Sequence, residues 1–305
     1  MFNDSAMIMM FNTITSTHPG SGTELSYVDM PIQREGHTGY PKMEASTLKG
    51  CIRNHVSQQE GGQEREAIIE RIFGKKDSGD FASAVSVTDA RILFFPVKSA
   101  KGIMAWITCP MVLKRFFKDY QLAYGEVLPV IWEVKSGAIC GKECKINQRM
   151  NGKDVIMLED YTFIVDKDEQ FENFLQMLIE HLPDNVITKE MILERAVILS
   201  DDDFSGFVKY STEVNTRIRM DVKTGTVAEN GLFTEEYLPP EAILYSLAFF
   251  SDTHQAQSEA GKAATLNRNQ VKSEFLKLFP GGTIQVGADS TLGKGLMEVK
   301  MWEES

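Results

Sequence analysis

The sequence predicts a mixed α+β fold with a large hydrophobic core. Short apolar runs of strand length occur between segments whose apolar residues recur at helical spacing, and no internal repeat or low-complexity tract is visible. The chain has 305 residues, of which 43% are hydrophobic and 25% are charged. It is therefore long enough to form one large domain or two ordinary ones.

The N-terminal part of the chain predicts strands and helices in turn. Helical spacing predicts a helix from about 46 to 56, with Ser46 as its N-cap, and a second helix from 64 to 73 that ends at Gly74. Pro110 is expected to open another helix, because proline suits the first helical turn. Strands are expected at 7–14, 84–96 and 103–108, the last two as hairpin partners.

The remaining sequence continues this mixture. Residues 137–152 are rich in glycine and lysine and are expected to form a loop or mobile hairpin. Residues 213–220 alternate in strand fashion, turn-forming residues follow at 221–225, and a strand resumes at 226, which predicts a hairpin that projects from the core. Further helices are expected at 171–182, 188–199 and 267–279, and a final strand up to Trp302.

The apolar pattern disfavours membrane and secreted proteins. No stretch approaches the roughly 20 apolar residues that span a bilayer. The N-terminus lacks the positive charge of a secretory signal, so a cytoplasmic protein with reduced thiols is expected. Cys140 and Cys144 stand four apart without matching ligands nearby, which disfavours a zinc site.

The net charge of −11 disfavours a free-standing nucleic-acid-binding domain, which is usually basic. The charge is unevenly distributed, however. Residues 32–55 contain more basic than acidic side chains, whereas acidic residues collect at 154–172 and 201–203. This segregation fits a protein that holds a polyanion on one face, and it fits a solvated acidic surface equally well.

A glycine-rich turn at 18–22 is the first candidate for phosphate binding. Gly20 and Gly22 flank Ser21 just past the first strand, so the backbone can approach a ligand and turn its amides outward. His18 begins the turn, and Pro19 removes one backbone donor from it. An ordinary tight turn with a structural histidine is the alternative.

Asp29 is the candidate for acid–base or metal chemistry. Pro31 holds the residue before it in an extended conformation, so Asp29 lies on a stiff loop. Such a carboxylate can be a general base, a general acid or a metal ligand. The alternatives are an Asx turn or a helix cap for Asp29, and a surface ion pair between Arg34 and Glu35.

The helix that begins near Ser46 is a second candidate for phosphate binding. Helix N-termini attract anions, and Lys49 and Arg53 stand four residues apart on one face of the expected helix. Together they predict a phosphate-binding ridge. A solvated basic face explains the same pattern.

A third glycine segment lies near the C-terminus, at Gly293-Lys294-Gly295. It is neither a Walker motif nor a dinucleotide fingerprint, because the required strand, glycine spacing and helix are missing. A loop of this composition can wrap a nucleic-acid backbone. Hydrolase, metalloprotease and RNA-recognition aromatic motifs are absent from the sequence.

In combination, these segments resemble the backbone subunit of the type III-B CRISPR effector complex, a member of the repeat-associated RNA-binding (RAMP) superfamily. The most distinctive motif is the D-x-P-I-Q-R-E run that begins at Asp29, and its wording favours type III-B over the related type III-A subunit. The resemblance covers nearly the whole chain. It is carried by residues 18–22, 28–35, 38–41, 46–53, 87–91, 95–99, 216–221, 235–239 and 287–296.

The resemblance implies a single RAMP domain over 1–305, with a ferredoxin-like, RNA-recognition-type βαββαβ core. Insertions would occupy about 137–235, and the hairpin at about 213–236 would be the projecting thumb. Several copies would stack as a helical filament on a CRISPR guide RNA, together with other subunits of the complex. The thumb would kink the duplex of guide and single-stranded target RNA, and the target would be cut at each kink with a divalent metal, Mg²⁺ or Mn²⁺.

The resemblance also implies roles for individual residues. Asp29 matches the cleavage carboxylate of the family and would be the metal ligand, while Asp89 and Glu236 are second-line acids. A ribose 2′-hydroxyl can attack its own phosphate when the strand is bent into line, so one carboxylate suffices as base or metal ligand. The residues expected to hold RNA are His18, Gly20, Ser21, Gly22, Ser46, Lys49, Arg53, Arg217, Gly293, Lys294 and Gly295.

Two rival functions remain open at this point. The first is a scaffold of the same fold that binds guide RNA and does not cut. The second is a small-molecule or nucleotide-binding enzyme that uses Gly293 to Gly295 for phosphate. Self-association on RNA would exclude the second, and loss of cleavage on replacing Asp29 would exclude the first.

Overall fold

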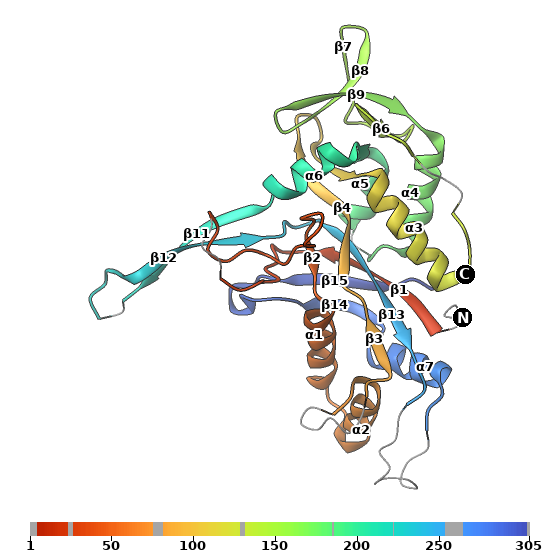
Figure 1. Ribbon diagram of the computed structural model, residues 1–305, viewed down its shortest axis with the longest axis vertical. Coiled ribbons are helices and arrows are strands. Elements are labelled where there is room, and N and C mark those ends of the chain that lie inside the picture. Colours follow the sequence, from red (N-terminus) through yellow and green to blue (C-terminus); the bar gives the residue numbers. More distant parts are fainter. Residues whose placement is uncertain are drawn as a thin grey trace.

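A large sheet and a separate two-stranded hairpin make up the β structure of the chain (Figure 1). The computed structural model describes residues 5–23, 27–75, 82–128, 132–184, 186–221, 223–253 and 265–303. Within these ranges, no helix is long and apolar enough to cross a membrane.

The elements follow one another in a mixed order. The 13-stranded sheet contains β1 (Ala6–Thr13), β2 (Lys42–Met43), β3 (Val85–Val87), β4 (Ala90–Ser99), β5 (Ile103–Thr108), β6 (Ala138–Cys140), β7 (Gln148–Met150), β8 (Lys153–Leu158), β9 (Tyr161–Lys167), β10 (Ala196–Leu199), β13 (Ile243–Phe250), β14 (Gly281–Gln285) and β15 (Leu296–Met301). The hairpin consists of β11 (Glu213–Met220) and β12 (Val227–Tyr237). The helices are α1 (Ala45–Ser57), α2 (Gly62–Phe73), α3 (Pro110–Tyr124), α4 (Glu169–His181), α5 (Val186–Arg195), α6 (Asp201–Tyr210), α7 (Arg268–Leu278) and the short 3₁₀ turn η3 (Ser290–Leu292).

The sheet has two parts that meet at β4. In the first part the neighbours run in the order β14-β15-β1-β13-β4, and every pairing is antiparallel. In the second part the order continues β5-β10-β6-β9-β8-β7. A further pairing between Ser99 of β4 and Leu158 of β8 brings this part back on itself. The second part is therefore barrel-like, whereas the first part stays open.

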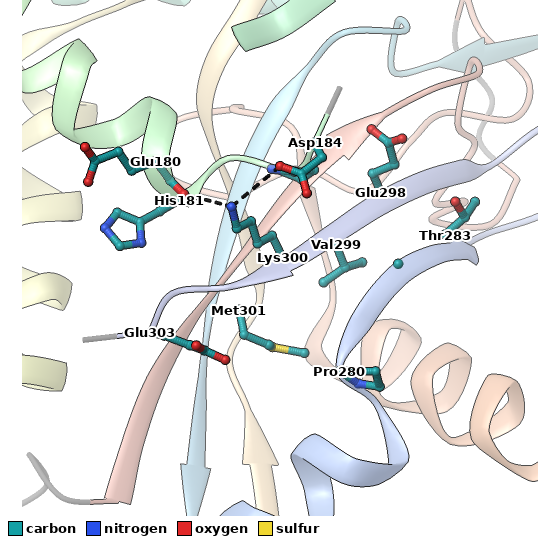
Figure 2. A pocket seen from close by; sticks show the side chains of 12 residues that line it. Glu180, His181, Asp184, Pro280, Thr283, Glu298, Val299, Lys300, Met301 and Glu303 are labelled. Carbon is teal, nitrogen blue, oxygen red and sulfur yellow. Dashed lines mark hydrogen bonds and ion pairs between the residues drawn. The ribbon is translucent and has the colours of Figure 1, made fainter. Parts of the chain in front are cut away.

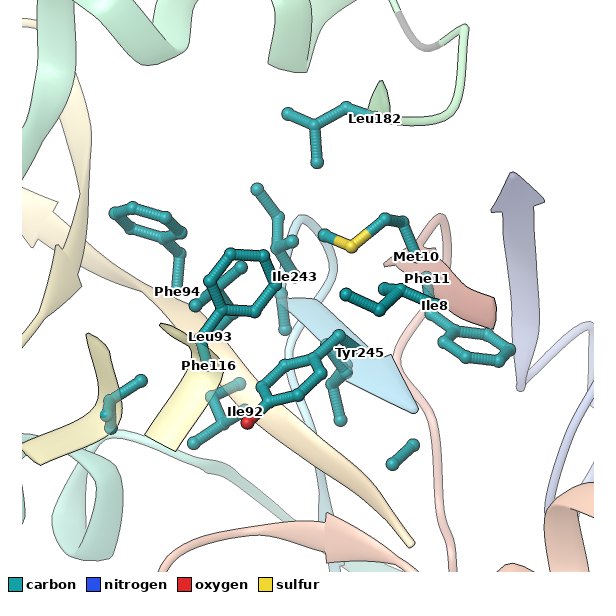
Figure 3. Packing of buried hydrophobic residues seen from close by; sticks show 14 of the residues in the cluster. Ile8, Met10, Phe11, Ile92, Leu93, Phe94, Phe116, Leu182, Ile243 and Tyr245 are labelled. Atoms are coloured by element: carbon teal, nitrogen blue, oxygen red, sulfur yellow. The ribbon is translucent and has the colours of Figure 1, made fainter. Parts of the chain in front are cut away.

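Strand β1 lies at the centre of the core, and all eight of its residues are buried. Helices cover both faces of the sheet here. On one face, the ring centroids of Phe116 from α3 and Tyr245 from β13 lie 5.0 Å apart (Figure 3). On the opposite face, Phe275 from α7 lies 5.5 Å from Phe250. A strand that is covered on both faces is apolar throughout, which explains the unbroken apolar run in the sequence.

Most of the expected elements are confirmed. The strand expected at 7–14 is β1, the segment at 103–108 pairs with β4 as a hairpin, and Pro110 opens α3. Asn267 caps α7 through a capping box with Gln270. The hairpin expected at 213–236 is confirmed as β11–β12, and it extends away from the rest of the molecule (Figure 1).

One helix prediction is wrong at its C-terminal end. The helix expected over 188–199 ends at Arg195, and 196–199 form strand β10 instead. All four strand residues are buried between β5 and β6, so tertiary pairing overrides the helical pattern. The acidic run at 201–203 is the first turn of α6, where Ser200 accepts the backbone N–H of Asp203 as the N-cap.

The N-terminus of α1 also differs from the expectation. Its N-cap residue is Glu44, which makes no side-chain cap, and Ser46 lies inside the helix. The cap comes from another segment, because Asp89 Oδ1 accepts the Ala45 N–H at 2.9 Å. Asp89 Oδ2 lies 2.8 Å from Lys42 Nζ. Ser46 is therefore not needed as a cap, and its side chain stays exposed.

Replacing Asp89 tests this cap supplied by a distant residue. We expect Asp89→Ala to lower the free energy of unfolding by about 1–2 kcal/mol, because a helix cap and an ion pair are lost together. Asp89→Asn should lose less, since an amide oxygen still accepts the Ala45 N–H. Denaturant unfolding measures both, with Asp160→Ala at an exposed position as the matched control.

The same contribution should depend on pH. Burial raises the pKa of Asp89, but the Lys42 ammonium and the Ala45 N–H outweigh it and leave this pKa below its usual value of 3.8. The stabilisation is therefore fully present above about pH 3.8 and is lost as the pH falls further. A difference between wild type and Asp89→Asn that grows between pH 5 and 8 would contradict this account.

Candidate functional site

The segment 27–35, which we call the Asp29 loop, lies along the base of the β11–β12 hairpin. The N–H of Met30 donates to the Thr234 carbonyl at 3.1 Å, and the Glu236 N–H donates to the Met30 carbonyl at 3.0 Å. These bonds form an isolated parallel bridge between the loop and β12. The loop is therefore attached to the hairpin as a short third strand.

Asp29 is exposed, and Thr234 holds its carboxylate. Oδ2 of Asp29 accepts the Thr234 N–H at 2.8 Å and the Thr234 hydroxyl at 2.9 Å. The Thr234 N–H, followed by its hydroxyl, lowers the pKa of Asp29 below its ordinary value. The side chain is thus a fixed, ionised carboxylate at the surface. Asp29 accepts these hydrogen bonds from β12, which is distant in the sequence. It therefore does not form the local Asx turn that was one alternative.

Gln33 joins the glycine turn at 18–22 to the start of α1. Its Nε2 donates to the Gly20 carbonyl at 3.1 Å and to the Thr47 hydroxyl at 3.2 Å. Its Oε1 accepts the Glu44 N–H at 2.6 Å. One side chain therefore fixes two of the expected phosphate-binding segments relative to each other.

Arg34 and Glu35 do not pair with each other as the surface alternative supposed. Arg34 bonds to Oε1 of Glu236 and donates to the Val208 carbonyl at 2.9 Å. Glu35 is buried and accepts from Arg115 Nη1 at 2.9 Å. Arg34 and Glu35 therefore connect the Asp29 loop to the hairpin base, to α6 and to α3.

The glycine turn is less open than the sequence suggested. The Ser21 N–H donates to the Pro31 carbonyl at 3.1 Å, so this amide is not turned toward a ligand. The His18 side chain is buried, and its Nδ1 lies 2.6 Å from a backbone carbonyl oxygen of β12. A Cβ on Gly20 would lie 2.7 Å from His18 Nε2, which explains the glycine. Gly20 to Gly22 remain exposed.

Arg217 connects the hairpin to the segment 287–296, which we call the C-terminal glycine loop. Its Nη1 lies 2.5 Å from Glu235 Oε2 and 2.7 Å from Asp289 Oδ2. The Tyr237 hydroxyl, with a single proton to donate, lies 2.8 and 2.9 Å from oxygens of the same two carboxylates. The hydrogen bonds from Arg217 to Asp289 and to Glu235 raise the pKa of Arg217. The guanidinium expected to hold RNA is therefore engaged within the protein.

The C-terminal glycine loop requires its glycines. Gly293 and Gly295 have φ angles of 72° and 77°, and a Cβ on Gly295 would collide with the carbonyl oxygen of Val286. Gly293 has open space around it. Lys294 Nζ lies 4.8 Å from the centre of the Tyr237 ring, so its ammonium is held over the hairpin base.

Lys49 and Arg53 of α1 lack acidic partners among the residues that the structure describes. Nε and Nη2 of Arg53 are buried without a hydrogen-bond partner. Burial, followed by repulsion from Arg53, lowers the pKa of Lys49. Two cations one turn apart on the same helix, with no acidic partner in the described ranges, favour an external anion at this position.

The second-line acids lie in ion pairs that support the structure. Asp89 caps α1, as described above, and Glu236 is 5% exposed. Glu236 Oε1 also accepts the Thr212 hydroxyl at 2.7 Å, and Oε2 accepts the Ile32 N–H at 3.0 Å. Among these carboxylates, Asp29 is the exposed one.

Asp29 would be the single protein carboxylate of a metal site at this position. In the described part of the chain, no group of three or more histidine, cysteine, aspartate or glutamate side chains could hold a metal ion. Mg²⁺ is commonly bound by one or two carboxylates, with waters and substrate phosphates as the other ligands. A single exposed carboxylate therefore fits a metal that arrives with the phosphate backbone of a substrate.

A separate hollow of about 630 Å³ lies between the end of α4 and strands β14 and β15 (Figure 2). Glu180, Asp184, Glu298 and Glu303 line it together with Lys300. Lys300 Nζ is already 2.8 Å from the Glu180 carbonyl oxygen and 3.7 Å from Asp184. This excess of negative charge disfavours the binding of a polyanion in the hollow and favours the surface around the Asp29 loop instead.

Thr234 is the part of the site that sequence reasoning missed. It lies 205 positions from Asp29, and nothing in its local sequence marks it. The neighbouring Glu235 and Tyr237 were part of the resemblance but had no assigned contact. Only the strand register of β12 brings these side chains to the Asp29 loop and the C-terminal glycine loop.

Comparison with known proteins identifies the superfamily to which the chain belongs. The RAMP superfamily model matches residues 10–298. The chain belongs to the RAMP superfamily.

The relatives within the superfamily are similar over nearly their whole length. The CRISPR system Cmr endoribonuclease Cmr4 of Pyrococcus furiosus is 36% identical over 98% of this chain and 96% of its own. The CRISPR system CMR subunit Cmr4 of Saccharolobus solfataricus is 26% identical over 94% of this chain and 93% of its own. The crystal structure of oligomeric Cmr4 from Pyrococcus furiosus superposes with a TM-score of 0.72 at 29% identity, covering 99% of both chains.

Replacing Arg217 tests the connection between the hairpin and the C-terminal glycine loop. We expect Arg217→Met to lower the free energy of unfolding by about 2 kcal/mol, because Glu235, only 2% exposed, would lose its cation. Arg219→Met is the matched control on the same strand, and we expect a change within about 0.5 kcal/mol. Equal effects of the two substitutions in denaturant unfolding would refute the connection.

Proposed function

We propose that this chain is the backbone subunit of a type III-B CRISPR ribonucleoprotein that binds guide RNA in several copies and cleaves complementary target RNA. The fixed, ionised and exposed carboxylate of Asp29 at the hairpin base is the observation that carries this function. The relative that is 36% identical over nearly the whole chain is named an endoribonuclease. Its solved structure is described as oligomeric, which supports self-assembly here.

The proposed core is ferredoxin-like, with β11–β12 as the thumb. The antiparallel order β15-β1-β13-β4 supports this assignment. Helix α1 lies between β1 and β4 in the chain, and α7 lies between β13 and β15. This succession gives a βαββαβ pattern with the strand order 4-1-3-2. The remaining segments are then insertions into that core.

The hairpin has the side chains of a wedge. Exposed apolar residues lie on one of its faces: Val214, Ile218, Met220, Val227 and Leu232. Ile218 and Leu232 are direct cross-strand partners. Apolar side chains of this kind can insert between bases and kink a nucleic-acid duplex. A kink in the target strand brings the 2′-hydroxyl, the phosphorus and the leaving oxygen toward an in-line arrangement.

Asp29 supplies the acid–base group in this proposal. Its carboxylate is ionised, so it can accept the proton of the attacking 2′-hydroxyl through Oδ1, while Thr234 occupies Oδ2. The 2′-oxygen then bonds to phosphorus as the P–O5′ bond breaks, and the leaving 5′-oxygen takes a proton from solvent water. A divalent metal, when bound, would stabilise negative charge on the phosphate. Asp29 is the residue that would hold it, and the RNA and water would complete its ligands.

Guide RNA is proposed to follow α1 and the two glycine segments. Lys49 and Arg53 supply cations without acidic partners in the described ranges. The exposed Ser46 lies one helical turn before Lys49. Gly22 and Gly293 have open space beside their Cα atoms, so the backbone has room there to approach phosphates. Each copy then neutralises only a few phosphates, which is compatible with a net charge of −11.

Replacing Asp29 distinguishes a nuclease from a scaffold of the same fold. We expect the reconstituted complex with Asp29→Ala to bind guide-complementary RNA normally and to lose cleavage by at least about 100-fold, because the acid–base group is removed. Regularly spaced products should appear with wild type and with Asp160→Ala. Unchanged cleavage by Asp29→Ala would move catalysis to another residue or subunit.

Replacing Lys49 and Arg53 of α1 tests the guide path. We expect Lys49→Gln and Arg53→Gln each to reduce the slope of log affinity against log salt for guide RNA by about 0.7, the value for one contact to a single strand. Lys153→Gln, on the exposed β7–β8 hairpin, is the control and should leave the slope unchanged. Equal slopes for all variants would place the RNA away from α1.

A further inference from the structure

We infer that Thr234 is a positioning residue for target cleavage. Its hydroxyl fixes the Asp29 carboxylate to the hairpin, so that the apolar wedge and the carboxylate move as one body. The inference rests on the proposed function, in which Asp29 acts on the kinked target strand. It adds a residue that touches no substrate and decides where the acting carboxylate lies.

The two residues are joined reciprocally. The Thr234 hydroxyl donates to Asp29 Oδ2 at 2.9 Å and accepts the Asp29 N–H at 3.0 Å. The Thr234 N–H adds a second donor to the same Oδ2 at 2.8 Å. The Tyr27 carbonyl oxygen lies 3.3 Å from the hydroxyl, so the single hydroxyl proton has a closer acceptor in Asp29.

The hydroxyl matters because it is one of the two groups of Thr234 that hold the exposed carboxylate in place. Asp29 is exposed, and among the other described residues Thr234 is the one that donates hydrogen bonds to its side chain. With the N–H alone, the carboxylate could rotate about one hydrogen bond and sample other rotamers. The hydroxyl adds a second point of attachment on the side chain and holds the Asp29 backbone N–H as well.

Thr234 also places the carboxylate next to the wedge. Its cross-strand partner is Thr216, and the adjacent pair on the same face of the hairpin is Ile218 with Leu232. Two residues along a strand span roughly 7 Å. Thr234 therefore holds the Asp29 carboxylate at a constant distance from Ile218 and Leu232. A base step that these two side chains displace would lie close to that carboxylate.

The loop keeps other attachments to the hairpin, which makes the hydroxyl separable from the fold. The Met30 N–H still donates to the Thr234 carbonyl, and the Glu236 N–H still donates to the Met30 carbonyl, whatever the side chain at 234. Valine has the shape of threonine and favours strands, so Thr234→Val removes the hydroxyl with little change in packing. Thr234→Ser restores the hydroxyl without the methyl group.

The test is single-turnover cleavage by the reconstituted complex at saturating guide-complementary RNA, with target affinity measured separately. We expect Thr234→Val to slow cleavage by about 10- to 100-fold, because a small misplacement of a catalytic group has this size of effect. Target affinity should stay within about twofold. Thr234→Ser should cleave within about threefold of wild type, and Thr162→Val, the control at an exposed threonine of strand β9 outside the site, should be unchanged.

Each other outcome has a definite meaning. Wild-type cleavage by Thr234→Val, with Asp29→Asn inactive, would overturn the positioning role and leave the proposed function intact. Equal slowing of Thr234→Val and Thr234→Ser, or weakened target binding by Thr234→Val, would assign Thr234 to the structure of the hairpin and also overturn it. Full activity of Asp29→Asn would overturn both proposals. Thr234→Ala replaces Thr234→Val in the same comparison if the valine variant fails to assemble.

Discussion

The ion pair between Arg34 and Glu236 is the interaction on which the rest of the site depends. Glu236 is almost fully buried, and it also accepts from the Thr212 hydroxyl and the Ile32 N–H. This one carboxylate therefore joins the Asp29 loop, the end of α6 and the base of the hairpin. Loss of either partner would leave a buried charge uncompensated, which is far more costly than loss of a surface pair.

The site is a meeting point of segments that are distant in the chain. Gln33 holds the glycine turn against α1, Arg217 holds the hairpin against the C-terminal glycine loop, and Thr234 holds Asp29. Much of its polar chemistry is thus internal, and the exposed groups are few. The exposed groups of the site are Asp29, Gly20 to Gly22, Gly293 and the apolar face of the hairpin, whereas Lys49 and Arg53 of α1 are partly buried. Such a division suits a subunit that grips RNA by shape and a few phosphates.

The sequence was informative where the determinants are local. The unbroken apolar run of β1, the proline that opens α3 and the alternation at 213–220 predicted elements that the structure confirms. Asp29 could be singled out because a proline and a distinctive motif surround it. Its partner Thr234 could not, since strand register, not local pattern, brings them together. For the same reason β10 was taken for helix and Ser46 for a cap, because β5, β6 and Asp89 decide those outcomes from elsewhere in the chain.

The central position of β1 has a consequence for synthesis of the protein. Its two neighbours in the sheet are β13 and β15, which lie more than 200 residues further along the chain. At the usual rate of translation, the first strand therefore waits on the order of tens of seconds for its partners. During this interval the apolar segment 7–11 is unpaired and is a natural ligand for chaperones at the ribosome. The contacts of Arg217 and Tyr237 with Asp289 are completed last, once the C-terminal glycine loop has emerged.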